Sequence, residues 1–179
     1  MSANSIWDAV HKLGAQRIGH GLRLRDDDQL LEHCVRNGIC MELCPISNEF
    51  TNSFRVPDVG FRARNSAKDG ARKVKSRDIY PLLDFLFAGL DVCLNTDNRS
   101  IHQDQTLTGE YLAAARLSGG LSRWEVLRLC KAGFKNAFLS KEDAAALIRH
   151  VEYEIYHIAC EHSGENRFQQ PERLMPKHL

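Results

Sequence analysis

Three short stretches of the sequence place polar side chains directly after apolar, β-compatible runs. His20 follows "QRIG", the stretch "CPISN" at 44–48 follows "ICMEL", and Asp97-Asn98 come shortly after "VCL". These residue types suit metal-assisted hydrolysis, because an Asp carboxylate can ligate zinc and a nearby His can hydrogen-bond a metal-bound hydroxide. An adjacent Asn amide can donate a hydrogen bond to a heteroaromatic ring nitrogen. The candidate site residues are therefore His20, Asp97 and Asn98, with Asp97 as the candidate metal ligand.

Each of these stretches also has an alternative reading. A lone His20 is often a structural histidine, and an Asp-Asn pair often forms an Asx turn. Ser47 and Asn48 are interpreted as bracing residues of the same rim. The spacing Cys40-x3-Cys44 admits a metal-binding pair, but no second pair completes such a site.

The elements that must position these residues alternate between helix and strand. Acids at 26–28 suit the first turn of a helix that Asn37-Gly38 ends, and Pro81 suits a helix start. Gly14 ends the first helix, for which Asn4 or Ser5 is the expected cap. The expected helices cover 4–13, 26–37, 78–88, 106–118, 122–132 and 141–160, and the expected strands cover 16–19, 39–43 and 90–96. This order predicts an α/β fold with parallel strands, whose carboxyl ends meet at one rim.

The totals are those of an ordinary globular domain. The chain has 179 residues, 43% hydrophobic and 26% charged, with a formal net charge of +1. We therefore expect neither nucleic acid nor a membrane as a partner, and the N-terminus lacks the pattern of a signal peptide. The six cysteines include no C-x-x-C pair, and several lie in apolar runs. This usage predicts reduced, packed thiols and a cytoplasmic location.

One long segment has no clear periodicity. Residues 55–77 contain eight basic side chains and two acidic ones. The segment is interpreted as a solvated surface loop, with an active-site lid or a basic patch for an anionic ligand as the alternative. We expect one domain over 1–160 and a polar tail over 161–179.

The motifs "RIGHG", "CPISN" and "LNTDN", in that order, resemble the last three strand-end motifs of the adenosine deaminase family of zinc hydrolases. Three further stretches resemble helices of the same family: "SIWDAVHKLGAQ", "TLTGEYLAAA" and "LRLCKAGFKNAFLSKED". The resemblance covers residues 5–149, which is most of the chain.

The resemblance implies a (β/α)8 (TIM) barrel with its active site at the carboxyl rim. It implies that Asp97 ligates Zn²⁺ and helps to take a proton from the metal-bound water, and that His20 orients the attacking hydroxide. Asn98 stands where many relatives have a second aspartate that reaches purine N7. The implied reaction is hydrolytic deamination of adenosine to inosine and ammonia, with AMP or another purine nucleoside as the alternative substrate. The H-x-E…P-C-x-x-C signature of the cytidine-type deaminases is absent.

Other parts of the family site have no counterpart in these residues. The family's H-x-H zinc pair does not occur, and neither does its "HAGE" motif. We therefore expect the chain to hold strands six to eight of the barrel, as an incomplete C-terminal portion. We also expect the isolated chain to be inactive and to bind zinc weakly. The alternatives are a truncated enzyme, a partner chain that carries the N-terminal barrel half, and a non-catalytic fragment that binds a partner.

Overall fold

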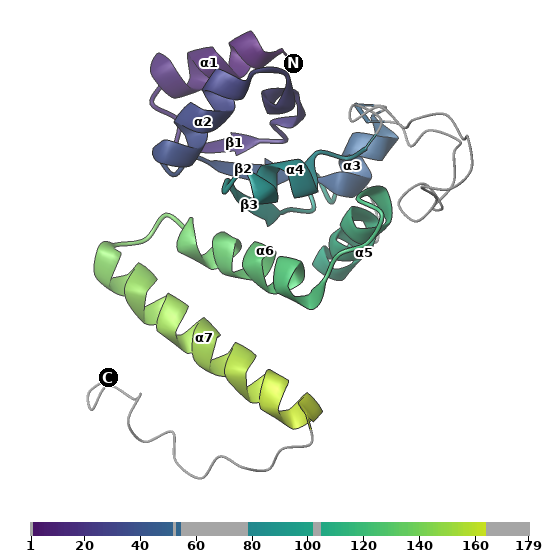
Figure 1. Cartoon of the computed structure of the whole chain (residues 1–179), viewed down its shortest axis with the longest axis vertical. Helices are drawn as coiled ribbons and strands as arrows, with labels where there is room; N and C mark the ends of the chain where they lie inside the picture. Colours follow the sequence, from purple (N-terminus) through teal and green to yellow (C-terminus); the bar gives the residue numbers. More distant parts are fainter. Residues whose placement is uncertain (1, 52, 55–78, 102–104, 164–179) are drawn as a thin grey trace. The chain divides into compact units, whose positions relative to one another are not determined.

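The computed structural model describes residues 2–51, 53–54, 79–101 and 105–163 (Figure 1). The chain divides into two compact units, Met1–Ala137 and Phe138–Leu179. The first unit contains the sheet and all of the candidate site residues. In the second unit the described residues form one helix, α7 (Lys141–Ser163).

The sheet of the first unit has three parallel strands in the order β1-β2-β3. These strands are β1 (Arg17–Gly19), β2 (Cys40–Leu43) and β3 (Asp91–Leu94). Ile18 lies beside Met41, which lies beside Val92 on the third strand. All three of these side chains are buried, as expected for a parallel sheet covered on both faces.

Helices connect the strands and cover the sheet. Figure 1 shows α1 and α2 together beside β1, and α6 packs against β3. Asp27 caps α2, since its carboxylate accepts a hydrogen bond of 2.9 Å from the Leu30 amide. Ser122 and Glu125 form a capping box at the start of α6. The helices of this unit are α1 (Ala3–His11), the short 3-10 helix η1 (Leu22–Asp26), α2 (Asp28–Arg36), α3 (Pro45–Phe50), α4 (Leu82–Phe87), α5 (Leu107–Leu117) and α6 (Arg123–Lys135).

One apolar core joins the sheet to these helices. Its largest fully buried side chains include Tyr80, Phe85, Met41 and Leu129. Tyr80 is the exception in this core, because it brings a polar hydroxyl group to a fully buried position. That hydroxyl lies next to the candidate site described below.

The alternation of strands and helices predicted from the sequence is confirmed, with three local corrections. The "CPISN" stretch, which lies outside the expected helices, is the start of α3, because Pro45 occupies the first helical position, where its missing N–H costs nothing. The helix near Pro81 begins at Leu82, and Pro81 is its N-cap residue. Ser2 is the N-cap residue of α1, in place of the expected Asn4 or Ser5.

Two sequence predictions fall on residues that the structure does not describe. The basic segment 55–77 lies outside the described residues, and so does most of the tail 161–179. The helix α7 continues to Ser163, and the proposed domain boundary at residue 160 stays a prediction.

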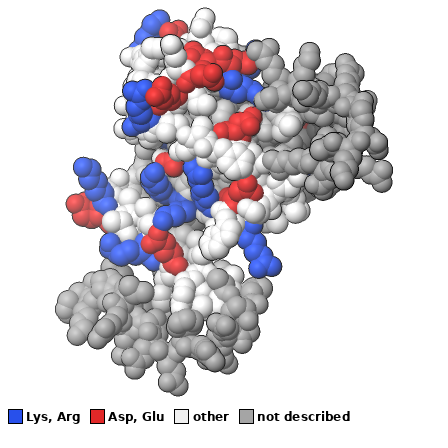
Figure 2. Space-filling view, in the orientation of Figure 1, with Lys and Arg blue, Asp and Glu red and all other residues white. Residues whose placement is uncertain are grey.

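The described surface carries charged side chains of both signs. Figure 2 shows Lys and Arg side chains interspersed with Asp and Glu on the visible face. Exposed ion pairs such as Lys12–Asp8 and Lys135–Asp91 contribute to this mixture. None of the described helices combines the length and the apolar character that crossing a bilayer requires.

Candidate functional site

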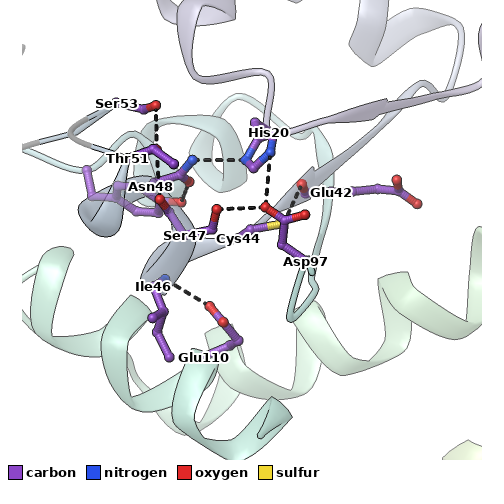
Figure 3. Close-up of polar contacts among 11 residues, drawn as sticks. His20, Glu42, Cys44, Ile46, Ser47, Asn48, Thr51, Ser53, Asp97 and Glu110 are labelled. Carbon is purple, nitrogen blue, oxygen red and sulfur yellow. Dashed lines mark hydrogen bonds and ion pairs between the residues drawn. The ribbon is translucent and has the colours of Figure 1, made fainter. Parts of the chain in front are cut away.

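The candidate site lies at the carboxyl ends of the three strands (Figure 3). His20 follows β1, α3 follows β2, and Asp97 follows β3. The His20 amide donates to the Glu42 carbonyl at 2.8 Å, and the Asn95 amide donates to the Leu43 carbonyl at 2.9 Å. These two bonds extend the strand pairing by one residue. The predicted convergence of the three strand ends at one rim is therefore observed.

His20 and Asp97 share an unusual backbone conformation. Their φ angles are 60° and 57°, and they are the non-glycine residues with positive φ in the described part of the chain. The left-handed region costs a residue with a Cβ on the order of 1–2 kcal/mol. The fold holds both residues in this conformation, and Figure 3 shows their side chains turned toward each other.

His20 and Asp97 face each other across that point. His20 Nε2 lies 3.7 Å from Asp97 Oδ2, which is ion-pair range and too long for a direct hydrogen bond. Both side chains keep about a third of their surface exposed, at 35% and 36%. Ser47 Oγ donates to the same Asp97 Oδ2 at 2.6 Å and so fixes the rotation of the carboxylate.

A buried hydrogen-bond chain sets the tautomer of His20. The Tyr80 hydroxyl donates to Asn48 Oδ1 at 2.7 Å, and burial raises the pKa of Tyr80, so this hydroxyl keeps its proton. With its oxygen engaged, Asn48 presents Nδ2 to His20 Nδ1 at 2.9 Å. Nδ1 is therefore the acceptor in this pair. The neutral imidazole must carry its proton on Nε2, which is the nitrogen that faces Asp97.

A third possible metal ligand lies at the same point. The ligand atoms of His20, Cys44 and Asp97 all lie within 4.8 Å of one another. Burial, aided by the charge of Asp97, raises the pKa of the Cys44 thiol to about 12, so Cys44 is a neutral thiol and a weak ligand. Cys40 contacts Cys93 instead, with a distance of 3.9 Å between the sulfurs. The Asp97 carboxylate fits a zinc ion as one ligand, whereas His20 presents an N–H donor at the same point, and the described residues do not supply the whole ligand set.

Asn98 is placed differently from the other two predicted residues. Its Oδ1 accepts a hydrogen bond of 3.0 Å from the Ser100 amide, which is the geometry of an Asx turn. The amide nitrogen of this exposed side chain is the part that can donate to a ligand. A hollow of about 470 Å³ lies along the same loop, lined by Leu94, Asn95, Thr96, Arg99, Thr106 and Leu107.

The sequence interpretation missed two residues that support the site. Tyr80 stands in a stretch interpreted as the start of a helix, and nothing in its neighbours indicates a hydrogen bond to Asn48. Glu110 is fully buried, although it lies in a helix with exposed residues on both sides of it in sequence. Its Oε2 accepts a hydrogen bond of 3.0 Å from the Ile46 amide. A charged residue on the apolar side of a helical pattern was the available signal for Glu110.

Comparison with solved structures defines the class of fold. An adenine deaminase from Arthrobacter aurescens superposes with a TM-score of 0.65 over 87% of this chain and 41% of its own, at 22% identity. An amidohydrolase from Burkholderia ambifaria with bound Zn gives a TM-score of 0.70 over 92% of this chain and 40% of its own, at 18% identity. The α/β fold of this chain is thus similar to a part of each of these two structures, and its described residues contribute a short parallel sheet to that fold.

Sequence comparison identifies the family. The adenosine deaminase family model matches residues 1–59 and 68–154. An adenosine deaminase of Klebsiella pneumoniae strain 342 is 34% identical over 147 residues, which cover 82% of this chain and 38% of that protein. One from Enterococcus faecalis is 34% identical over 83% of this chain and 37% of its own length. The chain belongs to the adenosine deaminase family, and it spans less than two-fifths of the length of these relatives.

Proposed function

We propose that this chain contributes to the hydrolytic deamination of adenosine to inosine and ammonia at a zinc site. The observation that supports this function most directly is the meeting of His20 Nε2 and Asp97 Oδ2, 3.7 Å apart at the carboxyl ends of parallel strands. The family membership and the names of the relatives agree with it. On this reading the chain supplies strands six to eight of the barrel.

Each residue of the site has a role in this proposal. A zinc ion, when bound, lowers the pKa of water and so provides a nucleophile at neutral pH. Asp97 supplies a carboxylate ligand whose rotation Ser47 fixes. His20 presents an Nε2–H donor, set by Asn48, to the oxygen that adds to purine C6. Asn98 offers its amide N–H to purine N7 and needs no protonation to do so.

A second candidate substrate is AMP. Arg99 follows Asn98 directly and lines the hollow of about 470 Å³ beside the site. A guanidinium there could pair with a phosphate group. The adenine deaminase among the similar structures makes the free base a further substrate to include in any assay.

The remaining zinc ligands must come from other residues. The 179 residues contain no H-x-H pair, and a catalytic zinc site normally takes three protein ligands. We therefore propose that this chain alone is inactive. Activity then requires the other barrel strands, on a separate chain or on a longer form of this one.

A complementation assay tests the proposal. The chain is assayed for ammonia release from adenosine, AMP and adenine, alone and mixed with the N-terminal segment of the Klebsiella pneumoniae relative that this chain does not match. We expect activity with adenosine and bound zinc only in the mixture, and loss of both in Asp97→Asn. A stable complex without ammonia release on any of the three substrates would favour the non-catalytic alternative. Activity of the isolated chain set by added zinc would contradict the proposed inactivity.

A further inference from the structure

Glu110 is a buried carboxylate that the proposed reaction does not use. It lies on α5 with 0% of its surface exposed, among apolar neighbours such as Ala113 and Ala114. A buried carboxylate is unfavourable unless hydrogen bonds satisfy it, so a fold that keeps one normally uses it. Glu110 Oε2 accepts a hydrogen bond of 3.0 Å from the Ile46 amide, and this contact indicates what the residue does.

This bond anchors the start of α3. Ile46 follows Pro45, the first residue of that helix, so its amide is one of those that have no partner inside the helix. A carboxylate at this end also interacts favourably with the partial positive charge of the helix terminus. At only six residues, α3 has little intrinsic stability of its own, so its position depends on such contacts.

The two residues after Ile46 each hydrogen-bond one of the two candidate catalytic side chains. Ser47 Oγ donates to Asp97 Oδ2 at 2.6 Å, and Asn48 pairs with His20 Nδ1 at 2.9 Å (Figure 3). Ser47 and Asn48 are themselves 2% and 1% exposed. A rotation or fraying of the first turn of α3 would therefore change both contacts together.

We propose that Glu110 is the positioning residue of this site: by holding the Ile46 amide, it fixes the first turn of α3 and thereby the orientation of Asp97 and the Nε2–H tautomer of His20. Glu110 acts on His20 and Asp97 through α3. The tautomer is a property of the chain itself, whereas its value for deamination rests on the proposed function.

The same pair of helices offers a matched control. Arg116 of α5 forms a two-pronged ion pair with Glu49 of α3, and Arg116 is half exposed. Exposed ion pairs contribute little to stability. Glu49→Gln thus removes the charge of one ion-pair partner between the same two helices and leaves the first turn of α3 unaltered.

Nuclear magnetic resonance of the labelled, zinc-free chain tests the proposal. The measurements are the His20 tautomer, from long-range nitrogen–proton spectra, and the exchange rate of the Ile46 amide. In Glu110→Leu we expect Ile46 exchange to rise about tenfold and the share of the Nδ1–H tautomer to rise about fivefold, the size expected for loss of one hydrogen bond. Glu110→Gln keeps an uncharged acceptor, so both measured values should lie between those of Glu110→Leu and those of the unaltered chain. Glu49→Gln should match the unaltered chain.

Three results would overturn the proposal. The first is a folded Glu110→Leu with both measurements unchanged. The second is an equal effect from Glu49→Gln, which would make any α3–α5 contact sufficient. The third applies if Glu110→Leu fails to fold: an Ile46 amide exchange rate in Glu110→Gln equal to that of the unaltered chain. Failure of the ammonia assay with the expected tautomer shifts would count against the proposed function and leave the role of Glu110 intact.

Discussion

At the residue scale, the site depends on side chains that fix other side chains. Tyr80 fixes Asn48, and Asn48 fixes His20, so the proton of a surface imidazole is set by a fully buried phenol. Ser47 does the same for Asp97 with one short hydrogen bond. The candidate catalytic side chains of His20 and Asp97 are partly exposed. The residues that hold them, Ser47, Asn48 and Tyr80, are buried. Substitutions of the supports should therefore affect stability as well as geometry.

Tyr80→Phe tests this support. It leaves the buried Asn48 Oδ1 without its donor, so we expect a loss of about 1–3 kcal/mol in the free energy of unfolding. The amide of Asn48 also becomes free to rotate, which would mix the His20 tautomers. Urea unfolding measures the first effect. Tyr153→Phe on α7 removes a hydroxyl from a partly exposed tyrosine and serves as the control. Equal losses in the two variants would contradict the role of Tyr80.

The positive φ of Asp97 gives a second prediction. The free energy of unfolding of Asp97→Gly should exceed that of Asp97→Ala by about 1 kcal/mol, because glycine enters the left-handed region without a Cβ penalty. Urea unfolding measures the difference. Both variants remove the proposed zinc ligand. The same pair of substitutions at Asp8, in the exposed part of α1, should show the opposite order, since alanine is the better helix former. The same order at both positions would argue against strain at Asp97.

The sequence predicts some of these residues and not others, for a physical reason. His20 and Asp97 are predictable because each follows an apolar strand, and parallel strands bring their carboxyl ends together. Asn98 is a candidate from its residue type as well as from the resemblance, and its position in an Asx turn is the local alternative that the sequence also admits. The contacts of Tyr80 and Glu110 are not predictable, because their partners lie 32 and 64 positions away and no short-range pattern encodes such contacts.

At the element scale, close packing fixes how each strand leads into its helix. Gly21 follows His20 with φ +65°, and a Cβ there would lie 2.5 Å from Met41 Sδ on β2. Only glycine fits this turn without movement of the Met41 side chain. The predicted strands and helices have the right order because hydrophobic periodicity encodes them. The "CPISN" stretch became a helix because proline permits a helix start as well as a turn.

Two alanine substitutions separate the conformational and the steric parts of this requirement. Gly14→Ala has the same φ of +65° with no atom within 4 Å of the added Cβ, so we expect a cost of about 1 kcal/mol. Gly21→Ala adds overpacking against a buried methionine and should cost about 1–3 kcal/mol more. Thermal or urea unfolding gives both values. Similar costs for the two would show that Met41 moves aside freely.

At the scale of the whole molecule, buried thiols make stability depend on alkaline pH. All six cysteines are free, and four of them are buried. Burial raises the pKa of Cys34 to about 11, and burial with nearby negative charges raises that of Cys44 to about 12, from a usual 9.0. The folded state thus holds protons that the unfolded state releases above pH 9. The contribution of Cys34 and Cys44 to the free energy of unfolding is fully present below that pH and is lost as the pH rises toward 11 and 12.

The corresponding measurement is urea unfolding between pH 8 and pH 10.5. We expect the free energy of unfolding to fall above pH 9 by roughly 1.4 kcal/mol per pH unit for each of the two thiols of Cys34 and Cys44. Cys34→Ala should lower the whole curve, because it opens a small cavity, and should also reduce the slope above pH 9. A slope equal to that of the unaltered chain would mean that Cys34 does not contribute to it.

The contacts of Tyr80 have a consequence for the length of the chain between the site's supports. The ring of Phe54 packs edge-on against Tyr80 with centroids 5.2 Å apart, so the two ends of the segment between them meet beside Asn48. When the ends of a connection are already clasped, adding residues between them changes the closure entropy only slowly. The contact between Phe54 and Tyr80 therefore limits how far a change in the length of that segment can displace Asn48 and its partner His20.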